Sequence, residues 1–292
     1  MKNGFVIFLA AVAALMVSWC GLVLAPTLQL GGAKLTTVLN STDTYPPQRT
    51  GAATLGLQVY RANGCAACHT ESVRQDGVVA EVTLTSLGTY KPEDFQAFVH
   101  SLFMSLPELQ NVTNAIAASL QDWKGTLPKT FLVTSDKAVA DKLVQSVNVP
   151  GMKLSVRIVP TGPDLARGWG VRRSVAADYL YDQPVQLGSL RAGPDLANIG
   201  VRAPDARWQL QHLYAPKSNS PNSTMPAFKY LFTVRKVGSA PSADALKLPK
   251  EFAPAAGYEV VPTTEASELA AYLLSLRANV PLYEAPFTSA KP

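Results

Sequence analysis

Hydrophobic and polar positions are unevenly distributed along this chain, and its most apolar stretch lies near the amino terminus. The segment from Gly4 to Ala25 is an uncharged apolar run, and about 20 such residues span a bilayer as a helix. A cleaved signal peptide is the alternative, but its apolar core is usually only ~7–15 residues long, and Pro26 would follow the cleavage point. We therefore expect a retained transmembrane anchor over residues 1–26, followed by a tether over residues 27–50.

Helical periodicity appears in two segments that are far apart in the sequence. Residues 52–63 carry apolar side chains at helical spacing and lead directly into Cys65. The second segment begins at Thr263 or Thr264, either of which suits a helix N-cap, and continues to about Asn279. Its apolar face is formed by Leu269, Tyr272, Leu273 and Leu276.

Residues 77–160 show a different pattern, in which helical and strand-like segments follow one another. We expect helices over residues 91–104 and 107–123, and then a strand–helix–strand unit. Its strands are Thr130–Thr134 and Lys153–Val159, and its helix begins at Ser135 or Asp136 and ends at Val147. The sequence of this segment has no Gly-rich phosphate loop, acid pair or metal cluster. The pattern predicts a small inserted α/β module whose role its residues do not indicate.

Composition changes this picture only slightly. Of the 292 residues, 47% are hydrophobic and 16% are charged, and the formal net charge is +5. Lys and Arg are scattered and form no basic stripe interleaved with aromatic residues, so we expect no nucleic-acid partner. Lys2 and the amino terminus carry the positive charge beside the apolar run, which places that end in the cytoplasm.

The segment Cys65-Ala66-Ala67-Cys68-His69 carries the clearest chemistry. Two cysteines at this spacing followed by a histidine form the attachment signature of a c-type haem, in which the thiols bind the vinyl groups and the imidazole binds iron. A redox CxxC pair does not require His69. A zinc site would need a second Cys/His pair, and Cys20 is the one remaining cysteine. We therefore expect one covalently bound haem c, with His69 as an iron ligand.

A second axial ligand would close the other face of the iron. Among five methionines, Met225 lies in a proline-flanked polar loop and is the best candidate. Met104 and Met152 fit packing positions, and His100 or His212 would instead give a bis-histidine site. Ligation by His69 and Met225 would raise the reduction potential and leave no open coordination position, which favours electron transfer over oxygen chemistry.

Two similar segments could support the axial histidine. Gly193-Pro194-Asp195-Leu196 precedes Arg202, and Gly162-Pro163-Asp164-Leu165 precedes Arg172. A proline carbonyl can accept the second ring N–H of the histidine, and an arginine can pair with a haem propionate. We prefer Pro194 and Arg202, because they lie nearer to the Met225 loop.

With these residues, the chain resembles the monohaem subunit, subunit II, of cbb3-type cytochrome c oxidases. The resemblance covers the anchor, residues 59–69 and residues 179–232, where it includes Tyr181–Ser189, Gly193–Leu196, Trp208, His212 and Thr224–Ala227. It implies a mainly α fold: an N-terminal transmembrane helix plus a class I-like cytochrome c domain, interrupted by a small α/β insertion. The domain would comprise residues 51–76 and 161–292, with Gly56 and Tyr60 crossing Leu269 and Tyr272. The insertion over residues 77–160 and the segment Val234–Pro262 depart from the family.

The resemblance also implies a function. The protein would relay electrons through its haem to the haem–copper catalytic subunit of an oxidase that reduces oxygen to water, with no catalytic site of its own. A further cytochrome c subunit and membrane lipid would be its other partners. It would cross a bacterial inner membrane once, with its haem domain in the periplasm. The cytochrome subunit of a nitric oxide reductase is the alternative, followed by a haem-based sensor and then a stand-alone enzyme.

Overall fold

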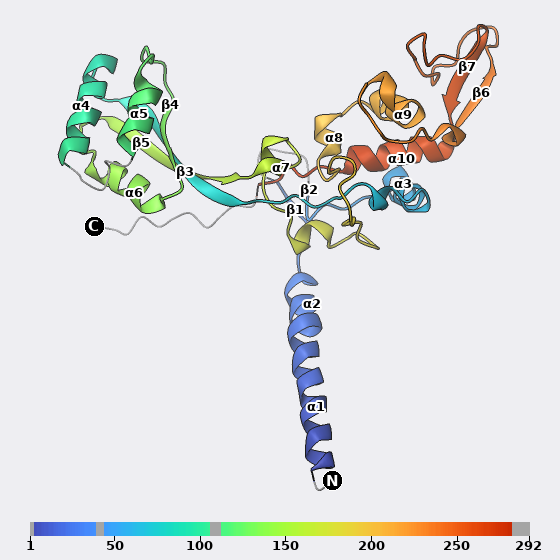
Figure 1. Ribbon diagram of the computed structural model, residues 1–292, viewed down its shortest axis with the longest axis horizontal. Coiled ribbons are helices and arrows are strands. Elements are labelled where there is room, and N and C mark those ends of the chain that lie inside the picture. Colours follow the sequence, from blue (N-terminus) through green and yellow to red (C-terminus); the bar gives the residue numbers. More distant parts are fainter. Residues whose placement is uncertain (1–2, 39–43, 106–111, 282–292) are drawn as a thin grey trace. The chain divides into compact units, whose positions relative to one another are not determined.

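The structure, a computed structural model, describes residues 3–38, 44–105 and 112–281 (Figure 1). It divides the chain into two compact units. Unit 1 comprises Met1–Val73 and Gly168–Pro292, and unit 2 comprises Arg74–Arg167. Helices predominate in unit 1, whereas unit 2 combines helices with a sheet, so the expected mainly helical chain with some strands is confirmed.

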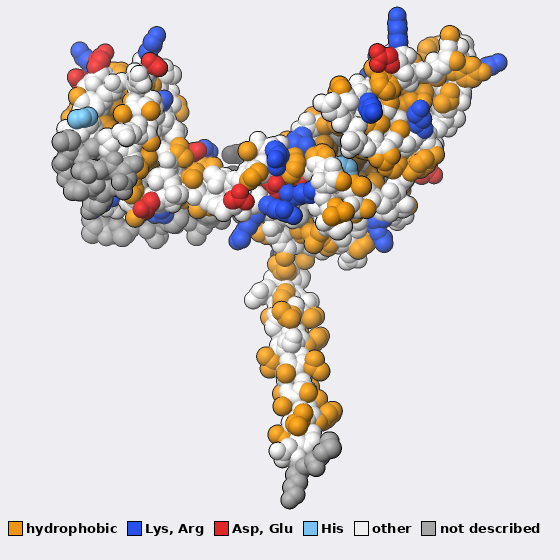
Figure 2. Space-filling model, viewed as in Figure 1, with side chains coloured by type: hydrophobic (Ala, Val, Ile, Leu, Met, Phe, Trp, Pro, Cys, Tyr) orange, Lys and Arg blue, Asp and Glu red, His pale blue; other side chains and the backbone are white. Residues whose placement is uncertain are grey.

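The N-terminal helix is long and apolar enough to span a membrane. It consists of α1 (Gly4–Trp19), a π-helical turn (Cys20–Leu24) and α2 (Ala25–Leu30), with a mean hydropathy of 2.5. Apolar side chains cover it on the sides visible in Figure 2, and none of its residues in α1 is buried. The helix continues past residue 26, where we expected the tether to begin. A proline ring clashes with the carbonyl group four residues earlier in a regular helix, and the wider π turn before Pro26 provides room for it.

Two helices cross at the centre of unit 1, as the sequence predicts. They are α3 (Ala52–Ala62) and α10 (Thr264–Ser275), whose N-cap Thr263 accepts a hydrogen bond from the Ala266 amide. A Cβ atom at Gly56 would lie 1.9 Å from the carbonyl oxygen of Glu268, so only glycine permits this close approach. The rings of Tyr60 and Tyr272 pack with their centroids 5.1 Å apart.

The remaining elements of unit 1 complete one core. They are β1 (Thr36–Thr37), β2 (Thr44–Tyr45), α8 (Ile199–Arg202), α9 (Ala206–Tyr214), β6 (Phe232–Lys236) and β7 (Tyr258–Pro262), with 3₁₀ turns at Cys65–Ala67, Ala176–Tyr179, Pro216–Ser218 and Lys229–Leu231. Strands β6 and β7 pair antiparallel, a hairpin that the sequence analysis did not predict. The core consists of apolar residues from the helices and this hairpin, among them Leu57, Leu196, Leu213, Val260, Leu269 and Leu276.

Unit 2 is a three-stranded antiparallel sheet with helices. The strand order is β4 (Lys129–Thr134), β3 (Gly77–Leu87), β5 (Met152–Thr161). The helices are α4 (Pro92–Ser105), α5 (Thr113–Leu120), α6 (Lys137–Ser146) and α7 (Pro163–Ala166). The expected strand–helix–strand unit is present as β4, α6 and β5, but β3, which was not predicted, lies between its two strands. Residues 107–111 of the expected second helix lie outside the described residues. The core of unit 2 includes Val82, Leu84, Phe95, Ile116, Leu132 and Leu143.

Candidate haem site

A cavity of about 550 Å³ lies in unit 1, and every candidate site residue lines it. The volume falls in the ~300–1,000 Å³ range typical of cofactor pockets. The lining comes from the Cys65–His69 turn, the loop around residue 194, helix α9, the loop that precedes Phe228, and helix α10. The candidate residues among them are Cys65, Cys68, His69, Pro194, Arg202 and Met225.

The Cys65–His69 turn is held by its own backbone. Gly64 adopts a left-handed conformation (φ +65°) that ends the preceding helix. The amides of Cys68 and His69 both donate to the Cys65 carbonyl oxygen, at 3.1 and 3.0 Å. This single turn brings two thiols and one imidazole to the same cavity.

The two thiols are free, and their setting is unlike that of a redox pair. Burial raises the pKa of Cys65 to about 12, whereas reactive CxxC thiols have a lowered pKa. Among the residues that the structure describes, no group of three or more His, Cys, Asp or Glu side chains could hold a metal ion. The raised pKa of Cys65 is therefore unlike that of a redox CxxC pair.

The imidazole of His69 is positioned by the loop that contains Pro194. Its Nδ1 lies 2.8 Å from the Pro194 carbonyl oxygen. Because a carbonyl oxygen can only accept a hydrogen bond, Nδ1 carries the proton and donates. Nε2 is then the unprotonated nitrogen, free to bind a metal. The Gly193 amide donates to the Cys68 carbonyl oxygen at 2.9 Å, so the two loops are joined by backbone as well. Of the two similar segments, the second lies at the cavity.

Asp195 connects this loop to the extended segment that follows the histidine. Its carboxylate is fully buried and accepts hydrogen bonds from the Thr70 hydroxyl (2.5 Å) and the Ser72 amide (2.9 Å). Arg191 forms an ion pair with it at 3.3 Å. Asp164 of the first segment accepts instead from the Arg74 amide at 2.8 Å within unit 2. Each aspartate therefore accepts a hydrogen bond from a backbone amide in the segment that follows His69: Asp195 from Ser72, and Asp164 from Arg74.

Arg202 has the properties expected of a residue that binds an anion. One of its Nη atoms donates to the Asp195 carbonyl oxygen, while its buried Nε has no hydrogen-bond partner among the described residues. Burial lowers the pKa of this guanidinium, and Asp195 only partly offsets the effect. A buried N–H without a partner is costly, and the Arg202 side chain also lines the cavity. The corresponding Arg172 is already paired with Asp178 at 2.7 Å.

The loop that carries Met225 is attached to helix α9. Gln211 donates to the Ser218 hydroxyl at 3.0 Å, and the Phe228 amide donates to the Leu213 carbonyl oxygen at 2.9 Å. Met225 packs partly buried against the core. Of the alternative histidine ligands, His212 lines the cavity, whereas His100 lies exposed on α4 in unit 2.

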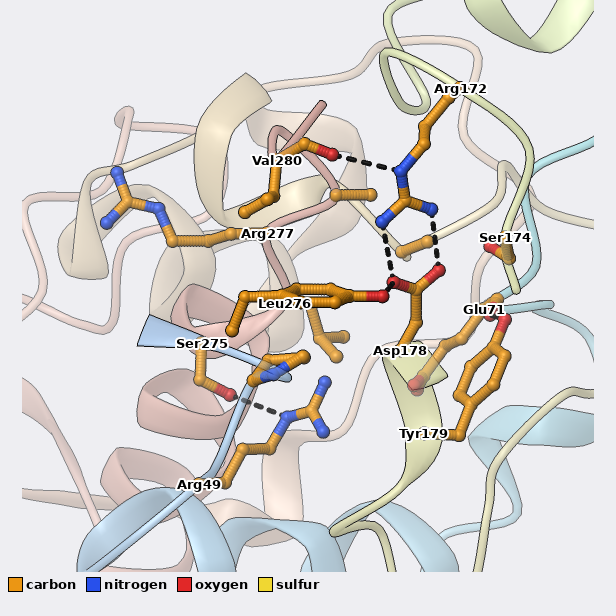
Figure 3. Close-up of a pocket in the computed structure, with 14 residues that line it drawn as sticks. Arg49, Glu71, Arg172, Ser174, Asp178, Tyr179, Ser275, Leu276, Arg277 and Val280 are labelled. Atoms are coloured by element: carbon orange, nitrogen blue, oxygen red, sulfur yellow. Dashed lines mark hydrogen bonds and ion pairs between the residues drawn. The ribbon is translucent and has the colours of Figure 1, made fainter. Parts of the chain in front are cut away.

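A second cavity, of about 50 Å³ and with several charged side chains in its lining, was not predicted from the sequence (Figure 3). Arg172 points toward Asp178 and the Val280 carbonyl oxygen, and Arg49 toward Ser275. The Tyr272 hydroxyl donates its one proton to the carboxylate of the buried Glu71 and lies 2.9 Å from both carboxylate oxygens. Burial raises the pKa of Glu71 to about 7, against the opposing effects of Tyr272 and Arg49. The cavity is too small for a cofactor, and its groups stabilise the segment that follows His69.

Comparison with known families supports this assignment over part of the chain. The family model described as cytochrome c oxidase, mono-heme subunit/FixO matches residues 168–271. The resemblance to the monohaem oxidase subunits is confirmed. The matched segment contains Pro194, Arg202 and Met225, and it does not include Cys65–His69 or unit 2. A mono-haem family also supports haem as the cofactor. No curated protein matches the chain.

Proposed function

We propose that this protein is a membrane-anchored monohaem c-type cytochrome that relays electrons to the haem–copper catalytic subunit of a cbb3-type oxidase. The observation that carries the proposal is the 2.8 Å contact between His69 Nδ1 and the Pro194 carbonyl oxygen. It fixes an imidazole in the ligand tautomer inside a cavity that also contains two thiols and a methionine.

The residues that would hold the haem divide into three groups. Cys65 and Cys68 would form thioethers with its vinyl groups, His69 and Met225 would bind iron, and Arg202 would receive a propionate. Arg202 fits this role because it lines the cavity and Asp195 only partly offsets the burial of its charge. When bound, the haem would supply one-electron redox chemistry.

The chain's own residues then favour electron transfer over catalysis. The Pro194 carbonyl raises the basicity of His69, and two axial side chains leave no position for oxygen. Much of the cavity wall is apolar and includes Leu196, Leu213 and Leu269. The crossing of α3 and α10 around it supports a class I-like cytochrome c domain, interrupted by unit 2.

The location and partners follow from the helix and the family match. The apolar helix Gly4–Leu30 supports a single membrane span, and Lys2 supports a cytoplasmic N-terminus, which leaves the haem domain in the periplasm. The match to an oxidase subunit family supports a catalytic oxidase subunit as partner. The proposal further specifies that this subunit is of the haem–copper type and that a further cytochrome c subunit belongs to the same complex.

Purification of the tagged full-length chain from its native membrane tests this function. We expect it to carry one covalent haem, shown by the pyridine haemochrome spectrum, and to co-purify with a copper-containing complex that consumes oxygen. Carbon monoxide should leave the reduced, isolated chain's spectrum nearly unchanged. A copper-free complex that reduces nitric oxide would contradict the oxidase role. A prompt stoichiometric carbon monoxide shift would instead indicate a sensor with an open iron face.

A further inference from the structure

The cavity contains a second histidine that is held in the same way as His69. The Nδ1 of His212 lies 2.6 Å from the side-chain oxygen of Asn219. The amide of Asn219 has a fixed orientation, because its nitrogen donates to the Trp208 carbonyl oxygen at 3.2 Å. The oxygen of Asn219 therefore faces His212, and Nδ1 must carry the proton.

The consequence is an unprotonated Nε2. Within the described residues this nitrogen makes no hydrogen bond, and the imidazole lines the same cavity as His69 and Met225. An imidazole whose Nδ1–H is bound to an oxygen acceptor and whose Nε2 is bare has the form of a metal ligand. Burial lowers the pKa of His212, and so does the nearby His69, against the opposing bond from Asn219.

The His212 ring is also held by stacking. It lies parallel to the ring of Trp208, one helical turn earlier on α9, with an interplanar angle of 4° and centroids 5.0 Å apart. Helix α9 begins at Ala206 after the N-cap Asp205, whose carboxylate accepts from the Arg207 amide. The imidazole thus belongs to a helix, whereas Met225 belongs to the loop that follows it.

We propose that His212 is a reserve axial ligand, whose Nε2 binds the haem iron when Met225 leaves it. This inference rests on the proposed function. In the exchange an iron–sulfur bond breaks and an iron–nitrogen bond forms, with no electron or proton transferred. Since His/Met ligation raises the potential of a c-type haem, exchange to two histidines would lower it. The chain would then have a second, low-potential state of the same haem.

The test uses the full-length protein with Met225→Ala, followed by electron paramagnetic resonance and optical spectroscopy. We expect the sulfur–iron charge-transfer band to disappear while the ferric haem remains low-spin. The double variant Met225→Ala/His212→Phe should become high-spin and bind carbon monoxide promptly. Phenylalanine retains the stacking on Trp208 and removes the lone pair. His212→Phe alone should retain the charge-transfer band, and Met225→Ala/His100→Ala should behave like Met225→Ala.

Asn219 provides a second readout, because it positions His212 without touching iron. In the Met225→Ala background, Asn219→Leu removes the acceptor at Nδ1 and should convert part of the haem to the high-spin form. Asn219→Asp restores an acceptor and should restore the low-spin spectrum. A purely structural role for Asn219 would not produce this rescue.

Two outcomes would overturn the inference: a high-spin haem in Met225→Ala, or a low-spin haem that persists in the double variant. Either leaves the proposed function intact if the unmodified chain shows a covalent haem and the charge-transfer band. Absence of covalent haem from the unmodified chain would instead contradict the proposed function itself.

Discussion

Gly193 lies in direct contact with the imidazole of His69. A Cβ atom at this position would be 2.3 Å from Cε1 of the ring and 2.7 Å from Nδ1. Carbon atoms do not approach so closely, so the ring and the glycine backbone define each other's positions. Glycine is required before Pro194 because a side chain there would collide with the His69 ring. A left-handed backbone is not the reason, since Gly193 does not have one.

Gly193→Ala should therefore displace His69 and break its bond to the Pro194 carbonyl oxygen. We expect less haem per chain, and a higher potential in the fraction that retains haem, since the histidine loses the acceptor that raises its basicity. Pyridine haemochrome analysis and redox titration measure the two effects. Gly238→Ala is the matched control, because a Cβ there meets nothing within 4 Å. Equal haem content in both variants would contradict the role assigned to Gly193.

The ion pair between Arg172 and Asp178 should contribute to the stability of unit 1. Both side chains are largely buried, 13% and 20% exposed, and the guanidinium makes two hydrogen bonds to the carboxylate, at 2.7 and 2.9 Å. Removing one partner leaves the other charge without its acceptor or donor. Asp178→Asn should lower the free energy of unfolding by about 2–3 kcal/mol at pH 7, measured by urea titration with the haem absorbance as the signal.

Because of the ion pair between Arg172 and Asp178, the free energy of unfolding should depend on pH. Burial alone would raise the pKa of Asp178, but the bonds from Arg172 and the Val175 amide outweigh it and lower the pKa below 3.8. The unfolded chain therefore binds the proton first as the pH falls. The contribution is complete above pH 3.8 and is lost as the pH falls through the lower, folded-state value. Below pH 3.8, the difference in free energy of unfolding between the unmodified chain and Asp178→Asn should therefore decrease. Arg235→Gln changes an ion pair whose arginine is 53% exposed, and it should cost less than Asp178→Asn.

The N-terminal helix should hold the protein in the membrane. Its apolar side chains are exposed in α1 and in the π turn that follows, with Phe5 73% and Leu22 76% accessible. We expect the full chain to resist extraction by alkaline carbonate, and a chain that begins at residue 31 to be soluble with its fold retained. Circular dichroism of the shortened chain provides the control. Recovery of the full chain in the carbonate supernatant, shortened at its N-terminus, would indicate a cleaved signal peptide instead.

The parts of the site that the sequence predicts are those with local signatures. The spacing of Cys65–His69 and the proline-flanked Met225 each identify a ligand from a few neighbouring residues. The support from Pro194 was also predicted, although it joins positions 125 residues apart, because a known haem arrangement suggested it. Gly193 and Asn219 were not singled out. Their roles depend on which ring or amide lies opposite them, and that is decided by the tertiary fold.

In the fold, too, elements with a local sequence signature were predicted, and elements that depend on tertiary contacts were mostly missed. Helices α3, α4 and α10 were predicted from periodicity and capping, which are properties of single segments. Strand β3 was missed although Ala80, Val82 and Leu84 alternate with more accessible positions, a period-two signal that the sequence does contain. The β6–β7 hairpin joins two five-residue strands across a long connection, and nothing local indicates such pairing. Helix α2 continues through Pro26 because a π turn precedes it, which hydropathy alone does not reveal.

Excision of the sheet module tests whether the haem domain folds without it. Val79 and Val159 are register partners in the antiparallel pair β3–β5, so their Cα atoms lie about 5 Å apart. Replacing residues 80–158 by Asn-Gly would close a two-residue hairpin at this pair. Each core cluster is formed within one unit. We therefore expect the shortened chain to attach haem and to retain the sulfur–iron band.

A matched variant separates loss of the module from loss of its fold. Val82 is fully buried in β3, so Val82→Asp in the complete chain should unfold unit 2 by burying a charge. We expect normal haem attachment in this variant too, together with protease cleavage confined to residues 74–167. Haemless protein from both variants would show that the module is needed for the haem domain to fold. If the excised chain lacks haem but the Val82→Asp variant retains it, unit 1 does not need a folded unit 2. The loss of haem would then result from strain that the new hairpin places on the connection to His69.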